Sequence, residues 1–582
     1  MKKNYYKKIR RRMLIVEICI TLAMTGVLAR AAYIQIWEGA DLTEKAQRGY
    51  KGSLVSRGKR GSVYDAHYRE LAVTLDTQSI GIHPKQVKDR SAVARRLSKV
   101  LRKNRKKLSR QLKTKRPFIW VKRQATHDEL TAVKALALPG VVFKPAHSRI
   151  YPNQFLAGQV IGFTGVDGSG LEGVEFRYDS YLRGQTDRFT VLRDARGRGF
   201  DAEQAVLPNY TGNNVVLTID ANIQFVAEQA LEQTVKEFNA QSGIALVMNP
   251  KTGAILAMAH YPFIDPNNYR RFKRDRWRNR IVTDAFEPGS TMKIFTAAAA
   301  IESKSCSAQS IFYCENGSYR VGRNVIHDTH PRGWLTVAKI VKYSSNIGAA
   351  KIAGAMGRET FHALLARFGF GSKTGIDCPG ETSGRLTSAR HWHPIDVANI
   401  AFGQGVAVSA IQLVTAVSAI ANDGVMMKPY LVQAVTDQHG RIIKNTTPKP
   451  VRRVISVRTA QVVRRIMASV VDEGGTGTKA ALASYTVGGK TGTAQKIDPD
   501  GSYSKKRFIA SFIGLAPVDN PKAVVFVAID EPLKRHYGGT VAAPAFKRIT
   551  RATLGYMAAS PSDKPAELSP LFRKAAMRKS GT

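Results

Sequence analysis

A long apolar run dominates the hydrophobic pattern at the start of the chain. Residues 13–36 contain only Glu17 and Arg30 as charged side chains, and about 20 apolar residues are enough for a helix to cross a bilayer. Seven Lys and Arg residues precede the run, which predicts a cytoplasmic basic tail at 1–12 and a periplasmic location for the rest. An alternative is a cleaved signal peptide, because the Ala-Arg-Ala triplet at 29–31 resembles a processing site. Because the run exceeds the usual length of such peptides, we expect an uncleaved, single-pass inner-membrane anchor.

Beyond residue 214 the pattern predicts strands at both ends of one segment. VVLTID is typical of a strand, and Asp220 behind it can cap a helix. GIALVMN and AILAMAH predict two strands joined by a turn at 250–253, and RFIASFIGLAP and AVVFVAID predict a second pair near the end. The helix expected after Asp220 has apolar residues at helical spacing, namely Ile223, Val226, Ala227, Ala230, Leu231 and Val235.

This order of elements predicts an α+β domain at 215–557, in which strands from both ends of the segment close one antiparallel sheet. The preceding residues 37–214 mix short β-type runs with a basic helical stretch around 92–113, and we interpret them as a scaffold. Residues 558–582 are polar and contain prolines, which predicts a flexible tail.

Length and charge narrow the possible functions. A chain of 582 residues is too long for one core, so two or more domains are expected. The net charge of +45 comes from 89 Lys and Arg against 44 Asp and Glu, and it attracts polyanions such as nucleic acid, anionic lipid or an acidic wall polymer. No zinc-finger, RNP or helix-turn-helix pattern accompanies the charge. Together with the expected location, this argues against nucleic acid as a partner.

The four cysteines suggest at most one small disulfide loop. Cys19 lies in the apolar run, whereas Cys306, Cys314 and Cys378 are expected to face an oxidising space. A bridge between Cys306 and Cys314 would contribute about 2 to 3 kcal/mol through chain entropy. The spacing alone leaves this pairing open.

The segment FEPGSTMKIF at 286–295 contains a candidate nucleophile and base. Ser290 follows a Pro-Gly pair, and Lys293 comes three residues later, ahead of an alanine-rich apolar run. On a helix the two side chains share a face, and burial would lower the pKa of the lysine until its amine accepts the serine proton. The start of a helix also favours a developing oxyanion. We therefore predict Ser290 as the nucleophile and Lys293 as its base.

Ser-x-x-Lys alone is weak evidence, because copies also begin at Ser56 and Ser502, and Ser290 taken alone fits a helix N-cap. Two further motifs favour the catalytic interpretation. YSSNIGAAKIAG supplies Ser344 and Asn346 from a tight loop ahead of a helix. VGGKTGTAQ supplies an expected edge strand that carries Lys490, Thr491, Gly492 and Thr493.

With these three motifs in this order, the sequence resembles a class B penicillin-binding protein, a membrane-anchored peptidoglycan transpeptidase. The resemblance covers nearly the whole chain and includes RGSVYD at 60–65, the segment 151–175, HDTHPRGWL, FGQGVAVSAIQL, GGTGTKA and YGGTVAAPAF. It implies a transpeptidase domain of the serine β-lactamase-like fold, with a five-stranded antiparallel sheet flanked by helices. It also implies a mixed, mostly-β pedestal of the dimerisation type at 37–214 and one N-terminal transmembrane helix.

The resemblance implies a catalytic role for five residues. Ser290 would attack the penultimate D-alanine of a D-Ala-D-Ala stem peptide, and Lys293 would take the serine proton. Ser344 would pass a proton to the leaving amine, and Asn346 would hold the substrate amide and Lys293. Lys490 would keep a positive field over the site and help to hold Lys293 neutral by charge repulsion.

The same resemblance implies a substrate-binding role for the edge strand, at Thr491, Gly492 and Thr493. The two threonines would hold the terminal carboxylate of the stem peptide. The backbone N–H groups of Ser290 and Thr493 would form the oxyanion hole. An amine from a second stem peptide would then resolve the ester and complete the cross-link.

Within the family, the motifs favour a division-type, FtsI-like septal transpeptidase that is a target of β-lactams. An elongation-type or spore-type relative is the alternative, followed by a β-lactam-binding sensor and a β-lactamase. The partners that the resemblance implies are an FtsW-type glycan polymerase, other division proteins and the membrane. No cofactor and no metal are expected, because the histidine pairs His327/His330 and His391/His393 lack an HExxH helix or a cysteine cluster.

Overall fold

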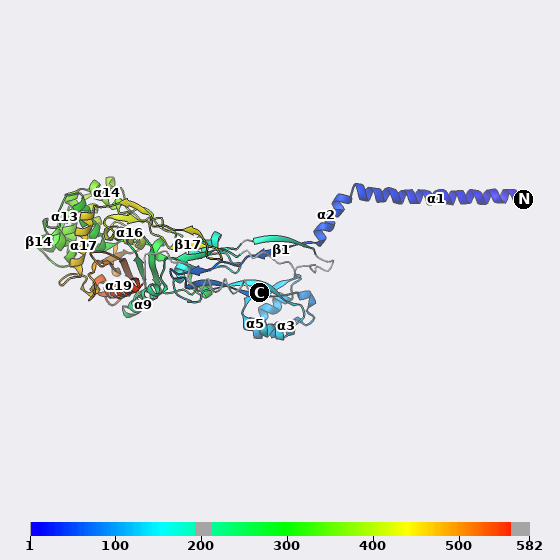
Figure 1. The fold of residues 1–582 in the computed structure, drawn as a ribbon, viewed down its shortest axis with the longest axis horizontal. Helices are drawn as coiled ribbons and strands as arrows, with labels where there is room; N and C mark the ends of the chain where they lie inside the picture. The colour runs from blue at the N-terminus through cyan, green and yellow to red at the C-terminus, as the bar shows by residue number, and fades with distance from the viewer. Residues whose placement is uncertain (1, 185, 193–210, 560–582) are drawn as a thin grey trace. The chain divides into compact units, whose positions relative to one another are not determined.

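The computed structural model describes residues 2–184, 186–192 and 211–559, which form two compact units (Figure 1). The first unit begins with helix α1 (Lys2–Ile36), followed by α2 (Gly39–Tyr50). The unit also contains an antiparallel strand pair, β1 (Lys51–Arg57) with β6 (Thr186–Leu192).

Helix α1 confirms the expected apolar helix and starts earlier than the apolar run. It has 35 residues and a mean hydropathy of 1.9 in its apolar part, so at 1.5 Å per residue it is about 52 Å long. The basic residues before Met13 continue the same helix because Lys and Arg are good helix formers. Within the described parts of the chain, α1 is the one helix long and apolar enough to cross a membrane.

The second unit contains the remainder of the expected pedestal, beginning at Lys59, and the expected transpeptidase region. The pedestal includes a seven-stranded sheet in the order β18-β17-β7-β2-β3-β4, with β5 paired to β3. Strand β7 pairs antiparallel with β17 and parallel with β2, so the sheet combines strands from before residue 218 with β17 and β18, which lie in the chain between α16 and α17. The strands are β2 (Val63–Tyr64), β3 (Glu70–Ile82), β4 (Ile119–Ala125), β5 (Val141–Ile150), β7 (Asn214–Leu217), β17 (Val432–Thr436) and β18 (Ile442–Asn445).

Two helices form the basic helical stretch that was expected around 92–113. Helix α3 (Arg90–Val100) is followed by Arg102, which has a positive φ of 48° that an α-helix does not accommodate. Helix α4 (Arg105–Leu112) is capped by Asn104, whose side chain accepts a hydrogen bond from the Lys107 N–H. Both helices bury their apolar faces with β3, β4 and α5 (His127–Ala135) in a separate small core.

A buried charge network joins two of the pedestal motifs. Glu175 accepts hydrogen bonds from Arg60 Nε at 2.6 Å and from Arg149 Nε at 2.7 Å. Arg60 Nη1 also donates to Asp179 at 2.6 Å. Since buried charges need partners, the segments RGSVYD and 151–175 have a structural role here, as expected for a scaffold.

The transpeptidase region is built on a five-stranded sheet in the order β20-β21-β22-β8-β9, in which every pair is antiparallel. This arrangement confirms the expected sheet and the expected edge position of the Lys-Thr-Gly strand, β20. The turn at 250–253 between β8 and β9 is also confirmed, with Gly253 at a φ of 86°. The strands are β8 (Ser242–Met248), β9 (Ile255–Tyr261), β20 (Gly488–Ile497), β21 (Tyr503–Ala516) and β22 (Ala523–Asp530).

Helices cover both faces of this sheet. Because side chains alternate along a strand, Ala245 and Val247 belong to one core and Leu246 and Met248 to the other. Helices α9 (Ala221–Glu237) and α19 (Ala543–Ala559) pack in the first core. Helices α11 (Lys293–Glu302), α16 (Ala410–Ala421) and α17 (Val457–Val471) pack in the second. Asp220 caps α9, as expected.

Short elements connect these layers. They are α6 (Gly158–Ile161), α7 (Gly173–Arg177), α8 (Asp179–Leu182), α10 (Arg280–Thr283), β10 (Ala285–Phe286), β11 (Ile311–Tyr313), β12 (Ser318–Val321), β13 (Asn324–His327), β14 (Trp334–Thr336), α12 (Val337–Tyr343), α13 (Asn346–Met356), α14 (Arg358–Arg367), α15 (Pro394–Ala401), β15 (Val408–Ser409), β16 (Val425–Met427), β19 (Pro450–Arg453) and α18 (Gly538–Val541). Most of the expected tail, residues 560–582, lies outside the described residues.

All four cysteines are free, so the Cys306–Cys314 bridge that the spacing left open is not formed. The extended strand β11 lies between the two residues in sequence. The buried Cys314 Sγ donates instead to the Phe312 carbonyl oxygen at 3.8 Å.

Candidate active site

Ser290 lies in a tight turn at the start of a buried helix. Residues Gly289–Met292 form a short 3-10 turn, η4, and α11 begins at Lys293. The turn is tight because Gly289 adopts a φ of 54°, which favours glycine. Neither η4 nor α11 has a side-chain cap. The alternative interpretation of Ser290 as an N-cap is therefore wrong.

The Lys293 amine lies among four oxygen atoms. Its Nζ is 3.0 Å from Ser290 Oγ, 2.6 Å from the Ser344 carbonyl oxygen, 3.2 Å from Ser344 Oγ and 2.7 Å from Asn346 Oδ1. A neutral amine has two N–H donors and one lone pair. The carbonyl oxygen and the amide oxygen can only accept, so they take the two donors and leave the lone pair for the Ser290 hydroxyl proton. This geometry suits a nucleophile and its general base.

Burial determines the charge of Lys293. The residue is 1% exposed, and burial lowers the pKa of its amine to about 7, against the opposing attraction of Asp328. Lys490 is also buried, and its pKa lies well below the usual value because of burial first and the nearby Lys293 charge second. The low pKa of Lys293 thus has burial as its cause, as expected from the apolar helix, whereas the expected repulsion from Lys490 is not among its causes.

The loop at Ser344 brings the two lysines together. Helix α12 ends at Tyr343, and Ser344 adopts a left-handed conformation with φ at 63°, which is uncommon outside glycine. Its Oγ lies 3.0 Å from Lys490 Nζ in addition to its contact with Lys293. Ser345 then caps α13 by accepting from the Gly348 N–H at 2.9 Å. The tight loop ahead of a helix is confirmed.

Asp328, which belongs to none of the three motifs, fixes this loop. Its carboxylate accepts hydrogen bonds from Ser345 Oγ at 2.5 Å, from the Ile347 N–H at 3.1 Å and from the Asn346 N–H. The carbonyl oxygen of His327 accepts from Asn346 Nδ2 at 2.9 Å, which turns Oδ1 toward Lys293. The HDTH segment, for which the sequence indicated a family resemblance but no specific role, thus orients the Ser-x-Asn motif.

Strand β20 presents Lys490 and two threonines to the same place. Lys490 Nζ donates to the carbonyl oxygen and the Oγ1 of Thr491, both at 3.2 Å. Thr491 Oγ1 donates to Thr476 Oγ1 at 3.1 Å, and Thr493 Oγ1 accepts from the Gly538 N–H at 3.2 Å. The segments GGTGTKA and YGGTVAAPAF therefore contact the Lys-Thr-Gly strand. These contacts could not be read from the sequence, because the segments are separate from the strand along the chain.

The edge of β20 approaches the Ser290 turn closely. A β-carbon on Gly492 would lie 3.0 Å from Thr291 Cγ2 and 3.2 Å from the Pro288 carbonyl oxygen, and one on Gly289 would lie 3.0 Å from the Thr493 carbonyl oxygen. Glycine at both positions lets the strand and the turn meet. In a strand the N–H and C=O of one residue point to the same side, so the Thr493 N–H also faces the Ser290 turn.

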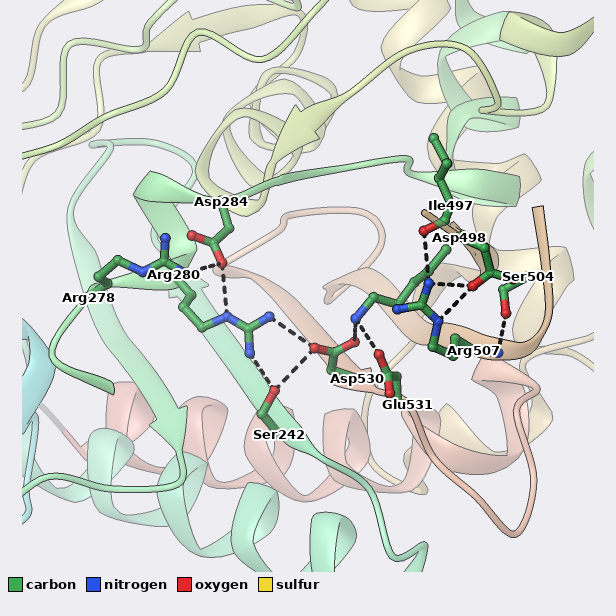
Figure 2. Close-up of polar contacts among 11 residues, drawn as sticks. Ser242, Arg278, Arg280, Asp284, Ile497, Asp498, Ser504, Arg507, Asp530 and Glu531 are labelled. Atoms are coloured by element: carbon green, nitrogen blue, oxygen red, sulfur yellow. Dashed lines mark hydrogen bonds and ion pairs between the residues drawn. The ribbon is translucent and has the colours of Figure 1, made fainter. Parts of the chain in front are cut away.

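Figure 2 shows a polar network that ties the far end of β20 to the segment before η4. Asp530 at the end of β22 accepts from Lys496 Nζ and from Arg280 Nη2, both at 3.0 Å. Lys496 also donates to Glu531 at 2.7 Å, and Arg280 to Asp284 at 3.0 Å. Because Lys496 lies near the end of β20 and Arg280 begins α10, the network links the two segments that carry the motifs.

The other Ser-x-x-Lys copies lack this environment. Ser502 is exposed in a turn, and Lys505 is exposed on β21. Ser56 belongs to strand β1. Within the ranges that the structure describes, no group of three or more His, Cys, Asp or Glu side chains forms a metal site.

Two family models match the chain. The penicillin-binding protein transpeptidase domain matches residues 243–551, and the penicillin-binding protein dimerisation domain matches residues 55–217. Fold and site together define a penicillin-binding transpeptidase.

Several known proteins are similar to this chain over most of its length. The chain is 35% identical to the probable peptidoglycan D,D-transpeptidase PenA of Neisseria meningitidis, covering 95% of this chain and 94% of the relative. It is 34% identical to stage V sporulation protein D of Bacillus subtilis (96% and 88% covered) and 32% identical to the peptidoglycan D,D-transpeptidase FtsI of Escherichia coli (93% and 91%). Penicillin binding protein 3 of Mycobacterium tuberculosis, solved with aztreonam, matches with a TM-score of 0.68 at 29% identity (88% and 99%). The chain belongs to the class B penicillin-binding proteins, the peptidoglycan D,D-transpeptidases.

Proposed function

We propose that this enzyme cross-links septal peptidoglycan through an acyl-enzyme on Ser290 during cell division. The observation that carries the chemistry is the 3.0 Å distance between Lys293 Nζ and Ser290 Oγ, with the lysine buried and its pKa near 7. At such a pKa about half of the Lys293 amines are neutral at pH 7. The base is therefore available at physiological pH.

In the acylation step Lys293 takes the hydroxyl proton of Ser290 while Oγ attacks the carbonyl carbon of the penultimate D-alanine. The N–H groups of Ser290 and Thr493 stabilise the oxyanion. Ser344, whose Oγ lies 3.2 Å from Lys293 Nζ and 3.0 Å from Lys490 Nζ, passes a proton to the leaving nitrogen. The C–N bond breaks, the terminal D-alanine leaves, and an ester on Ser290 remains.

The substrate is held by β20 and Asn346. The hydroxyls of Thr491 and Thr493 and the cation of Lys490 bind the terminal carboxylate. Asn346 uses Oδ1 for Lys293 and one N–H for the His327 carbonyl oxygen, which leaves its second N–H for the substrate amide. The amine of a second stem peptide then attacks the ester, releasing Ser290 and forming the cross-link.

Fluorescent penicillin tests this assignment. The Ser290→Ala protein should take up no covalent label, whereas Ser502→Ala, which changes the exposed Ser-x-x-Lys copy, should label like the wild type. Labelling of Ser290→Ala that survives denaturation would refute the assignment. Rapid turnover of the label by the wild type would favour the β-lactamase alternative.

The division role rests on the resemblance of the motifs to FtsI-type enzymes, and the similarity to Escherichia coli FtsI supports it. The similarity to stage V sporulation protein D supports a spore-type enzyme as the second candidate. A fluorescent fusion of the full chain should gather at midcell in constricting cells. A side-wall pattern would instead indicate an elongation-type enzyme, and a signal confined to developing spores would indicate the spore type.

The same proposal places α1 as a single-pass anchor in the inner membrane, with the N-terminus inside and the catalytic domain in the periplasm. Its support is the seven basic residues before the apolar run. An FtsW-type glycan polymerase and other division proteins are the proposed partners. Protease added to spheroplasts should degrade the transpeptidase region and leave an N-terminal tag intact, and protection of both parts would contradict this topology.

A further inference from the structure

A long, strongly basic segment lies in the pedestal, away from the catalytic motifs in sequence. Residues 84–144, here called the basic lobe, contain 19 Lys and Arg but three Asp and Glu. Seventeen of these cationic side chains are exposed. Within this fully described segment, the one internal ion pair joins Lys122 and Glu129. The lobe therefore presents a strongly positive surface to its surroundings.

Two helices hold this charge on a rigid surface. The outward side chains include Arg95, Arg96 and Lys99 on α3 and Lys106, Lys107 and Arg110 on α4, while the apolar sides of both helices fill the lobe's own core. Lys103 Nζ, between the helices, donates to the Val121 carbonyl oxygen of β4 at 2.5 Å. The charged helices and β4 thus form one folded body.

One exposed aromatic side chain lies on the same body. Trp120 pairs with Gly81 and therefore faces away from α3 and α4, because the neighbouring Ile80 and Ile82 fill the core beneath these helices. Trp120 of β4 is 36% exposed and packs edge-on against Phe118, with ring centres 4.9 Å apart. The Arg123 guanidinium lies 5.7 Å from the centre of the Trp120 ring, and the Lys144 ammonium lies 5.0 Å from that of Phe118. Tryptophan flanked by Lys and Arg is typical of side chains at the headgroup level of a bilayer. Binding of an acidic polymer would require only the positive charge, so the exposed tryptophan favours a lipid surface as the partner.

We propose that the basic lobe docks on the anionic phospholipid headgroups of the membrane that α1 crosses. Strand β4 forms an edge of the sheet, with α4 on one of its faces and Trp120 on the other. At this edge the cations of α4 bind lipid phosphates, and Trp120 enters the interface between headgroups and acyl chains. Because α1 belongs to the same chain, it keeps the local concentration of the lobe at the membrane high, so several weak contacts are enough. The proposal rests on the membrane anchor proposed above and is independent of the catalytic roles.

Hydrogen exchange on the full-length protein in nanodiscs tests this docking. Exchange of peptides from 105–123 should be slower in discs that contain phosphatidylglycerol than in discs of phosphatidylcholine alone, and high salt should abolish the difference because it shortens the screening length. Changing Lys106, Lys107 and Arg110 to Gln should lower the docking constant about 100-fold. Trp120→Ala should weaken the protection while the charge is unchanged.

A matched control removes three exposed cations elsewhere, with Arg323, Arg458 and Arg465 changed to Gln. This variant should keep the protection. Equal exchange in the two kinds of disc, or an equal loss in the control variant, would overturn the proposal. Soluble polyphosphate added to neutral discs is a further control. If polyphosphate slows the exchange and anionic lipid does not, the partner is an acidic polymer and not the membrane. Fluorescent penicillin labelling of every variant verifies folding, and a failure of Ser290 labelling in the wild type would refute the catalytic proposal without touching this one.

Discussion

The rate of Ser290 acylation should follow the protonation of Lys293, because only the neutral amine can accept the hydroxyl proton. With a pKa of about 7, the neutral fraction rises from about 0.1 at pH 6 to about 0.9 at pH 8. The second-order rate constant for acylation by fluorescent penicillin should therefore rise about tenfold over this range and then level off. The assay is a time course of labelling of the full-length protein at constant ionic strength, with protein stability checked at each pH.

Asp328→Asn sharpens this test, since the Asp328 charge raises the pKa of Lys293 against the effect of burial. Without that charge the midpoint of the profile should move to lower pH. The plateau should also fall about 10- to 100-fold, because the Ser345 hydroxyl and the backbone N–H groups of the loop lose a charged acceptor worth about 1.5 to 3 kcal/mol. Asp128→Asn, at an exposed position of α5, is the matched control and should change neither value.

Two outcomes would refute this reasoning. A rate constant that does not change between pH 6 and 8 would show that Lys293 is not the titrating base. A midpoint for Asp328→Asn above that of the wild type would show that the Asp328 charge does not act on the Lys293 amine as the geometry requires.

Two further substitutions test the packing around the site and the fold. Gly492→Ala places a β-carbon 2.2 Å from Ser511 Oγ, 3.0 Å from Thr291 Cγ2 and 3.2 Å from the Pro288 carbonyl oxygen. Even when the Ser511 hydroxyl rotates away, the β-carbon presses on the Ser290 turn, so the protein should lose about 1 to 3 kcal/mol of stability and acylate at least about tenfold more slowly. An unchanged acylation rate would contradict the close approach. Burial raises the pKa of Glu228 to about 8, so the folded protein holds a proton that the unfolded chain releases near pH 4.5. Its stability should fall by about 4 kcal/mol as the pH rises from about 4.5 to 8. Urea unfolding at pH 5 and pH 8 should show a smaller fall for Glu228→Gln, and an identical fall would contradict the buried neutral carboxyl.

The parts of the site with local signals were predictable from the sequence. The spacing of Ser290 and Lys293 ahead of an apolar helix, and the glycines before Lys490, each describe one element and its end. Strands β8, β9, β21 and β22 were equally predictable, because each contains an apolar run bounded by turn residues.

Contacts between distant segments were not predictable in this way. Asp328 directly follows β13, and its carboxylate accepts a hydrogen bond from Ser345, which directly precedes α13. No periodicity in the sequence links these two positions. Thr476 and Gly538 support β20 by contacts that only the folded sheet creates. The 3-10 turn at Ser290 depends on the left-handed conformation of Gly289, which its sequence permits without requiring.

The contacts of Lys490 indicate how the substrate completes the site. Its Nζ donates to three neutral oxygens, on Ser344 and Thr491, so burial and the neighbouring Lys293 hold its pKa low. A stem-peptide carboxylate bound by Thr491 and Thr493 adds a negative charge that favours the protonated Lys490.

The charge on Lys490 then disfavours a second charge on Lys293, so substrate binding itself drives Lys293 toward the neutral form that accepts the Ser290 proton. A stem-peptide ester with a free terminal carboxylate should therefore show a lower pH midpoint for acylation at saturation than the same ester with a terminal amide. Because loss of carboxylate contacts alone changes affinity and not this midpoint, equal midpoints for the two substrates would show that the two lysines titrate independently.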